Sequence, residues 1–117
     1  MVAGDAVFPA AATKTPKIMT GIELIAKERQ EQIEKHGRTV EHDDLYNYNG
    51  QLAWAAAHLL AKDFSEQLDD CCPDGWSQEI WDKMMGKSKV ERLAIAGALI
   101  AAELDRISMQ ESEVSHV

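Results

Sequence analysis

The chain has 117 residues, enough for one domain with a hydrophobic core, and its 45% hydrophobic content is ordinary for a globular protein. Its 20 acidic residues outnumber 12 basic ones, and the net charge of −8 argues against nucleic acid as a partner, because neutralising phosphates requires clustered Lys and Arg. No apolar run reaches the about 20 residues that cross a bilayer, so we predict no membrane partner. Cys71 and Cys72 are adjacent and cannot form an ordinary disulfide, which predicts a reducing, cytoplasmic setting.

The N-terminal part divides into a leader and a first helix. Residues 1–17 are rich in Ala, Pro and Thr without periodicity and are predicted to be a flexible leader, followed by one helical domain over 18–109. The first helix is expected to begin after Thr20, which can form a capping box with Glu23, and to end at Gly37. Arg29 falls inside its apolar stripe. Arg29 either lies along the core, paired with a carboxylate, or meets an anion in a cleft. We predict Arg29 and its neighbour Gln32 as binding residues.

A polar connection is predicted over residues 38–49. It contains His42, Asp43 and Asp44 in succession, and imidazole and carboxylate donors this close suit a divalent cation. The same residue types also cap helices, so a purely structural role stays open.

Two further helices are expected before the last one. The helix over 50–64 is apolar around most of its circumference and is predicted to be central. A short helix follows Ser77 and runs to Met85. Trp76 and Trp81 beside it form either a lid over a pocket or a plug at the end of the bundle.

The longest helix is predicted over 88–107, with Ser88 and Glu91 as its capping box. Every residue over 93–102 is apolar or glycine, which places this helix inside a bundle. The tail over 110–117 is polar and expected to fray. The fold class is therefore all-α, with three principal helices and one short helix. One amphipathic helix covers two apolar helices poorly, so we expect a homo-oligomer in which a second subunit completes the cover.

Acidic residues on separate helices form the candidate chemistry. Glu103 lies beside apolar positions of the longest helix and needs an arginine or a metal ion as a partner. Carboxylates on facing helices of a bundle can together hold a metal. The candidate ligands of a divalent cation are Glu28, His42, Asp43, Asp44 and Glu103.

Several runs of this sequence resemble a family of small phage and prophage proteins. The runs are Glu28-Arg29-Gln30, Glu41-His42-Asp43-Asp44, Gly50-Gln51-Leu52-Ala53 and Ala96-Gly97-Ala98-Leu99-Ile100 with Ala102-Glu103. The resemblance covers most of the chain from Ile25 to Ile107. It indicates a phage or prophage origin and implies no particular activity.

A looser resemblance links the chain to the MazG-like nucleoside triphosphate pyrophosphatases. Gly50-Gln51-Leu52-Ala53 looks like their Gly-Glu-Leu-Ala segment, and Glu103 with Asp105 lies on a later helix, as their second acidic motif does. The chain departs from that family at Gln51 and in the spacing of the second motif. The resemblance implies an oligomeric helical bundle that holds Mg²⁺ with carboxylates and splits an NTP into NMP and pyrophosphate.

Two functions follow from these patterns. The first, which rests partly on the MazG-like resemblance, is a Mg²⁺-dependent nucleoside triphosphate pyrophosphohydrolase-like protein with a nucleotide as its substrate. Its predicted Mg²⁺ ligands are the five candidate residues named above, and its predicted catalytic residues are Glu28, Asp43 and Glu103. The alternative is a non-enzymatic phage accessory protein that binds a protein partner, in which the same acidic and histidine residues form a structural network.

Overall fold

The computed structural model describes residues 18–64 and 72–115, with side chains described as far as residue 112. Within these ranges there are five helices and no strand, which confirms the all-α class. The helices are α1 (Gly21–His36), α2 (Val40–Tyr46), α3 (Gln51–Ala61), α4 (Gln78–Met85) and α5 (Lys89–Ser115). The predicted leader over 1–17 lies outside the described residues.

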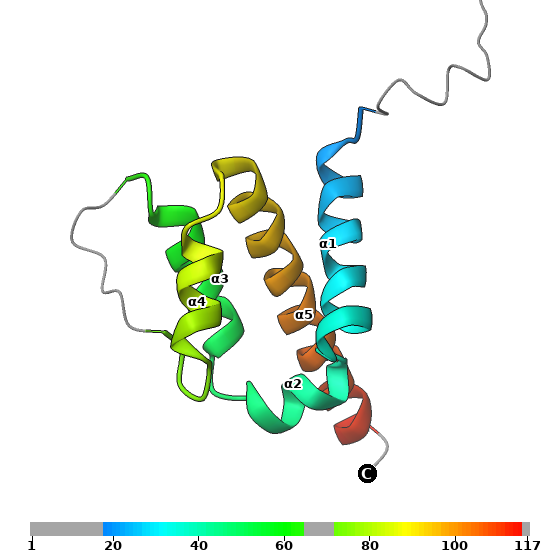
Figure 1. Ribbon diagram of the computed structural model, residues 1–117. Coiled ribbons are helices and arrows are strands. Elements are labelled where there is room, and N and C mark those ends of the chain that lie inside the picture. The colour runs from blue at the N-terminus through cyan, green and yellow to red at the C-terminus, as the bar shows by residue number, and fades with distance from the viewer. Residues whose placement is uncertain (1–17, 65–71, 116–117) are drawn as a thin grey trace, which may run out of the picture.

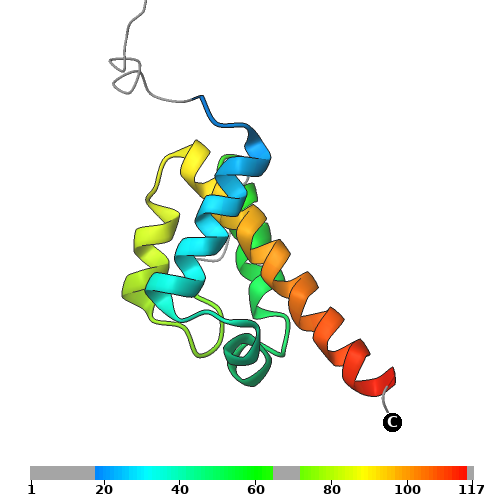
Figure 2. The same ribbon diagram turned by 90° about the vertical axis from the view of Figure 1, so that its right-hand side faces the viewer.

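The long helix α5 organises the fold (Figure 1). α3 runs antiparallel to it and makes the most extensive pairing, α1 runs parallel to it on another side, and α2 crosses the end of the bundle at which α1 finishes. Turning the molecule shows α4 on one side and the C-terminal half of α5 on the other (Figure 2).

Small residues of α3 and α5 allow these two helices to pack closely. Trp81 of α4 is only 1% exposed and closes one end of the core, against Trp54 and edge-to-face against Trp76. Trp81 is therefore a plug. The buried apolar cluster consists of Leu52, Ala55, Ala56, Leu59, Trp81, Met84, Ile95, Ala96, Leu99 and Ala102.

Arg92 ties the end of α3 to the beginning of α5. Its guanidinium donates to the Leu59 carbonyl oxygen at 3.0 Å and to both Asp63 carboxylate oxygens at 2.9 Å. A buried arginine needs such partners, because an uncompensated charge away from water is strongly unfavourable.

The predicted helix ends are largely confirmed. Thr20 and Glu23 form the expected capping box, and Ser88 with Glu91 forms the second one. Gly37 adopts a left-handed conformation with φ 65°, and its N–H donates to the Ile33 carbonyl oxygen at 3.2 Å, which is the αL motif at the end of α1.

Three element predictions need correction. The connection over 38–49 contains α2, because Thr39 caps the His42 N–H at 3.2 Å and acidic residues occupy the first turn. The predicted helix over 50–64 is shorter in the structure: α3 ends at Ala61, and the next three residues, through Phe64, form a turn. α5 continues through Ser115, so the helix includes most of the segment predicted to fray.

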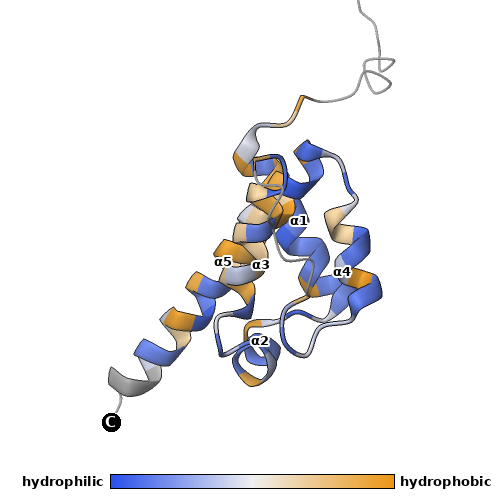
Figure 3. Ribbon diagram, turned by 90° about the vertical axis from the view of Figure 1, so that its left-hand side faces the viewer, coloured by the Kyte–Doolittle hydropathy of each residue, from blue (hydrophilic) through white to orange (hydrophobic). Residues whose placement is uncertain are grey.

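Apolar side chains also remain on the outside of the bundle. Figure 3 shows strongly hydrophobic segments along α5 up to its C-terminal part. In the described ranges, no helix is long and apolar enough to cross a membrane.

Candidate functional site

The structure distributes the predicted metal ligands over three places. Glu28 lies on the side of α1 that faces α4, and His42 and Asp43 lie where α1 meets α2. Asp44 of α2 and Glu103 of α5 both pair with Arg106 of α5. Among the described residues, no three His, Cys, Asp or Glu side chains come close enough to hold a metal ion together. The reason is helical geometry, since consecutive residues of α2 point about 100° apart and face different neighbours.

Glu103 and Asp44 both serve Arg106. The Arg106 side chain donates to Glu103 Oε1 at 2.8 Å and Oε2 at 3.1 Å, and its Nη1 lies 3.7 Å from Asp44 Oδ1. Gln110 adds a hydrogen bond of 2.9 Å to the same Asp44 oxygen. The hydrogen bonds that Arg106 donates to Glu103 raise the pKa of the Arg106 guanidinium above its ordinary value. Glu103 therefore has the arginine partner that its position requires.

Asp43 is fully buried at the junction of α1 and α2. Asn47 donates to its Oδ1 at 2.8 Å, while its Oδ2 has no hydrogen-bond partner within the described part of the chain. Burial raises the pKa of Asp43, although the Asn47 hydrogen bond and the nearby positive charges of Arg29, His42 and Arg38 act in the opposite direction. This carboxyl group is a buried acceptor held between helices.

Arg29 lies along the core and pairs with a carboxylate. Its Nη2 is 3.4 Å from Asp105 Oδ2, and its Nη1 donates to the Arg38 carbonyl oxygen at 3.0 Å. Of the two predicted roles, the structural one is the one seen, and Arg29 joins α1 to α5 and to the segment before α2.

A groove of about 470 Å³ lies between α1, α4 and the beginning of α5. Glu28, Glu31 and Gln32 of α1 line one wall, and Lys83, Lys87 and Glu91 line the other. Gln32 is almost fully buried, and its Oε1 has no hydrogen-bond partner among the described residues. The groove thus combines acidic groups, ammonium groups and a free amide oxygen.

The electrostatics of the groove are unfavourable for Glu28. Burial raises the pKa of Glu28, and the negative charge of Glu31 raises it further, with a smaller contribution from Glu91. Lys87 and His36 partly offset this effect. Like charges near one another in a hollow are a common feature of ligand and metal sites.

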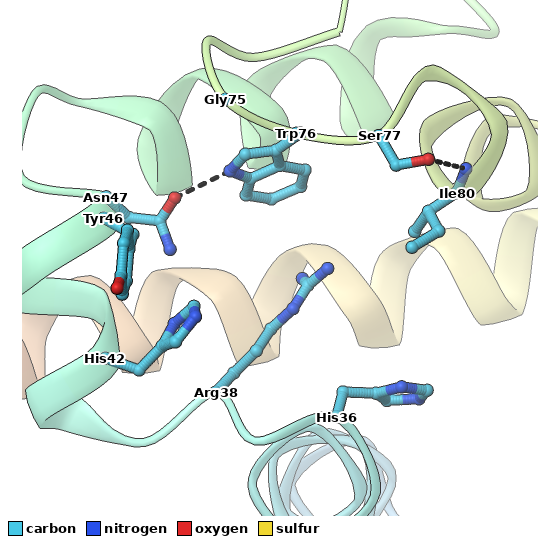
Figure 4. Close-up of a pocket in the computed structure, with 9 residues that line it drawn as sticks. All are labelled: His36, Arg38, His42, Tyr46, Asn47, Gly75, Trp76, Ser77 and Ile80. Atoms are coloured by element: carbon cyan, nitrogen blue, oxygen red, sulfur yellow. Dashed lines mark hydrogen bonds between the residues drawn. The ribbon is translucent and has the colours of Figure 1, made fainter.

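A second hollow of about 280 Å³ continues from the groove and shares His36, Arg38 and Ile80 with it. Figure 4 shows His42, Tyr46 and Trp76 around this hollow. The Trp76 indole N–H donates to Asn47 Oδ1 at 2.7 Å, and the Arg38 guanidinium lies 4.7 Å from the Trp76 ring centre. Burial lowers the pKa of Arg38. We call the second hollow the aromatic hollow.

Sequence reasoning missed Lys83, Lys87 and Arg38 as site residues. Lys83 is on α4 and Lys87 is in the short connection between α4 and α5, and single lysines at such positions are usually solvated, so the sequence carried no signal for them. Only the packing of α4 opposite α1 places these charges across the groove from Glu28.

The oxygen donors in the groove fit a Mg²⁺ ion that also keeps water molecules among its ligands. Mg²⁺ in proteins usually keeps several waters and is held by one or two carboxylates together with substrate phosphates, so an all-protein cage is not required. Glu28 and Glu31 are one turn apart on the same wall, and the Gln32 Oε1 is an oxygen of the hard type that Mg²⁺ prefers. Among the predicted ligands, Glu28 is the one that lines this groove.

Comparisons of the chain with models of protein families, with curated proteins and with solved structures gave no match in any of the three.

Proposed function

We propose that this chain is a Mg²⁺-dependent nucleoside triphosphate pyrophosphohydrolase, and that the groove receives the phosphates. The observation that carries the proposal is the groove itself, where Glu28 and Glu31 lie opposite Lys83 and Lys87. Carboxylates suit the metal ion, and ammonium groups suit phosphate oxygens. Its volume of about 470 Å³ falls in the range of small-molecule sites.

The adjoining aromatic hollow supplies room for the base of the nucleotide. Trp76, Tyr46 and His42 present rings on which a base can stack. Because the two hollows share Arg38, its guanidinium is positioned between base and phosphates. A nucleotide laid across both would place its charged end among the carboxylates and lysines.

In the proposed reaction, a water oxygen bonds to the α-phosphorus and the bond to the α–β bridging oxygen breaks, which gives NMP and pyrophosphate. Bound Mg²⁺ supplies charge stabilisation at the phosphate oxygens. Glu28, whose pKa is raised by burial and by the charge of Glu31, would accept the proton of the attacking water or orient it. Lys83 and Lys87 bind the leaving pyrophosphate.

The test is an assay for pyrophosphate release from the common NTPs and dNTPs with Mg²⁺ or Mn²⁺. Glu28→Gln and Glu31→Gln should each lower the rate by at least about 100-fold, the scale of losing one charge-stabilising group. Glu34→Gln is the matched control, since Glu34 is exposed on α1 and does not line the groove. No release from any nucleotide, or equal loss in all three variants, would count decisively against the proposal.

The alternative function, a non-enzymatic accessory protein that binds a protein partner, rests on the ion pairs. Arg106 forms ion pairs with Glu103 and Asp44, and Arg29 forms one with Asp105. These polar residues therefore stabilise the fold whether or not a substrate binds. The alternative predicts that the groove variants leave nothing catalytic to lose and that a partner protein is retained on an immobilised chain. Pyrophosphate release that depends on Glu28 would exclude it.

A further inference from the structure

The aromatic hollow is rich in hydrogen-bond donors, and its described lining carries no negative charge. Arg38, His36 and His42 line it, and no Asp or Glu does, although the whole chain has 20 acidic against 12 basic residues. Its volume of about 280 Å³ is small for a whole ligand and suits one part of a ligand, such as a purine base. The hollow therefore favours a base whose exposed edge accepts hydrogen bonds.

Arg38 is the strongest of these donors. Its guanidinium lies over the Trp76 ring, 4.7 Å from the ring centre, and makes no hydrogen bond or ion pair with the described residues. Figure 4 shows the Arg38 side chain reaching from the segment between α1 and α2 into the space beneath Trp76. An aromatic face attracts the cation without accepting any of the five N–H groups of its planar fork. Arg38 thus presents unused donors to the hollow.

The wall that holds Arg38 is fixed by a chain of two hydrogen bonds. The Trp76 indole N–H donates to Asn47 Oδ1 at 2.7 Å, and Asn47 Nδ2 donates to Asp43 Oδ1 at 2.8 Å. An indole N–H only donates and a carboxylate oxygen accepts, so a single orientation of the Asn47 amide satisfies both neighbours. Asp43 is itself fully buried. Trp76 is therefore held in place before a ligand arrives, which reduces the entropy lost on binding.

We propose that Arg38 selects 6-oxopurine bases, guanine and hypoxanthine, over adenine in the aromatic hollow. These bases carry two adjacent acceptors, O6 and N7, which match the arginine fork in a bidentate pair. Adenine has an amino group in place of O6, so it sets a donor against the guanidinium. This selection rests on the proposed function, in which the hollow receives the base, and it defines the substrates as GTP, ITP and their deoxy forms.

Binding of nucleoside monophosphates tests the selection without turnover. Isothermal titration calorimetry of the full chain should give at least about fivefold tighter binding for GMP than for AMP, the lower end of what one bidentate arginine contact contributes. IMP lacks the guanine amino group but keeps O6 and N7, so it should bind as GMP does. The 7-deaza analogue of GMP lacks N7 and loses one hydrogen bond, so it should bind at least about threefold more weakly than GMP.

Two variants assign the preference to Arg38. Arg38→Lys keeps the positive charge but loses the planar fork, so it should bind GMP and AMP about equally. Lys83→Gln is the matched control, because Lys83 lines the groove and not the aromatic hollow. It should weaken GMP and AMP by the same factor and leave the ratio of their affinities unchanged. Far-UV circular dichroism checks that each variant remains helical, and the 7-deaza comparison needs no variant.

Five results would each overturn the selection. They are equal affinity for GMP and AMP, IMP bound only as weakly as AMP, the 7-deaza analogue bound as tightly as GMP, no binding of any monophosphate at millimolar concentration, and a preference that survives Arg38→Lys. The proposed reaction can fail separately. A guanine preference without pyrophosphate release from GTP would overturn the reaction and leave the selection standing, whereas equal release rates from GTP and ATP would do the reverse.

Discussion

At the scale of single residues, the polar side chains divide into those saturated by neighbours and those that are not. Glu103 and Asp44 are committed to Arg106, whereas Glu28 has raised pKa and Gln32 has an oxygen without a partner in the described chain. Saturated groups stabilise the fold, and strained or open groups are where function is expected. Two predictions separate these classes.

The first concerns Glu28. Its folded-state pKa lies above the ordinary 4.5, so the folded chain binds this proton more tightly than the unfolded chain does. The corresponding stability is present below pH 4.5 and is lost as the pH rises through the folded pKa. Glu28→Gln carries no charge, so it should be more stable than the parent at pH 7 and equal to it near pH 4. Urea unfolding at several pH values measures the difference in the free energy of unfolding between Glu28→Gln and the parent. A stability advantage of the variant that grows as the pH falls would contradict the prediction.

The second concerns Glu103. Glu103→Gln weakens two hydrogen bonds to a guanidinium that is 7% exposed, and it should lower the free energy of unfolding by about 1.5–3 kcal/mol. Because Glu103 is remote from the groove, pyrophosphate release should remain within about twofold of the parent. Urea unfolding and the nucleotide assay test the two parts. A large loss of activity without loss of stability would return Glu103 to the catalytic set.

At the scale of elements, the helix α5 depends on close approach to α1 at Gly97. A Cβ built on Gly97 would lie 2.6 Å from Ile25 Cδ1 and 2.7 Å from its Cγ1, so Ile25 occupies the space that a side chain would need. Glycine here is a packing requirement, because its φ is ordinary and its helix propensity is poor.

Gly97→Ala should therefore destabilise the chain by up to about 2 kcal/mol, since overpacking outweighs the gain in helix propensity. In the background of Ile25→Ala the same change should be stabilising, which a double-mutant cycle measures. Gly21→Ala is the control, because its added Cβ meets no atom within 4 Å. Additive effects in the cycle would show that Ile25 is not the obstacle.

The element scale also shows what the sequence could and could not predict. The ends of α1 and the beginning of α5 were predictable because Thr20, Gly37 and Ser88 act through local hydrogen bonds. α2 was missed because it has only seven residues, and its apolar residues lie at the two ends around four polar ones, which is too short for a clear helical periodicity. The groove was not predictable, since Lys83 becomes a neighbour of Glu28 only when α4 packs opposite α1.

At the scale of the whole molecule, the groove between α1 and α4 is electrostatically unfavourable. Burial and the negative charge of Glu31 raise the pKa of Glu28, which lines this groove. A cation or a ligand that compensates these charges would bind the folded chain and not the unfolded one. The liganded chain is therefore expected to be more stable than the chain alone.

Metal binding should be visible as stabilisation of the whole fold. Mg²⁺ or Mn²⁺ at 100 times its dissociation constant should raise the free energy of unfolding of metal-stripped protein by about 2.7 kcal/mol, which moves the melting temperature by several degrees. Glu28→Gln and Glu31→Gln should abolish the shift, whereas Glu34→Gln should preserve it, because only the first two line the groove. Protein concentration is kept the same in every melt, so that the variants can be compared directly. If the melting temperature rises equally in all variants, the metal binds outside the groove. If metal does not raise the melting temperature at all, the proposed metal site is wrong, and the ion pairs with Arg29 and Arg106 are the role left for Asp105 and Glu103.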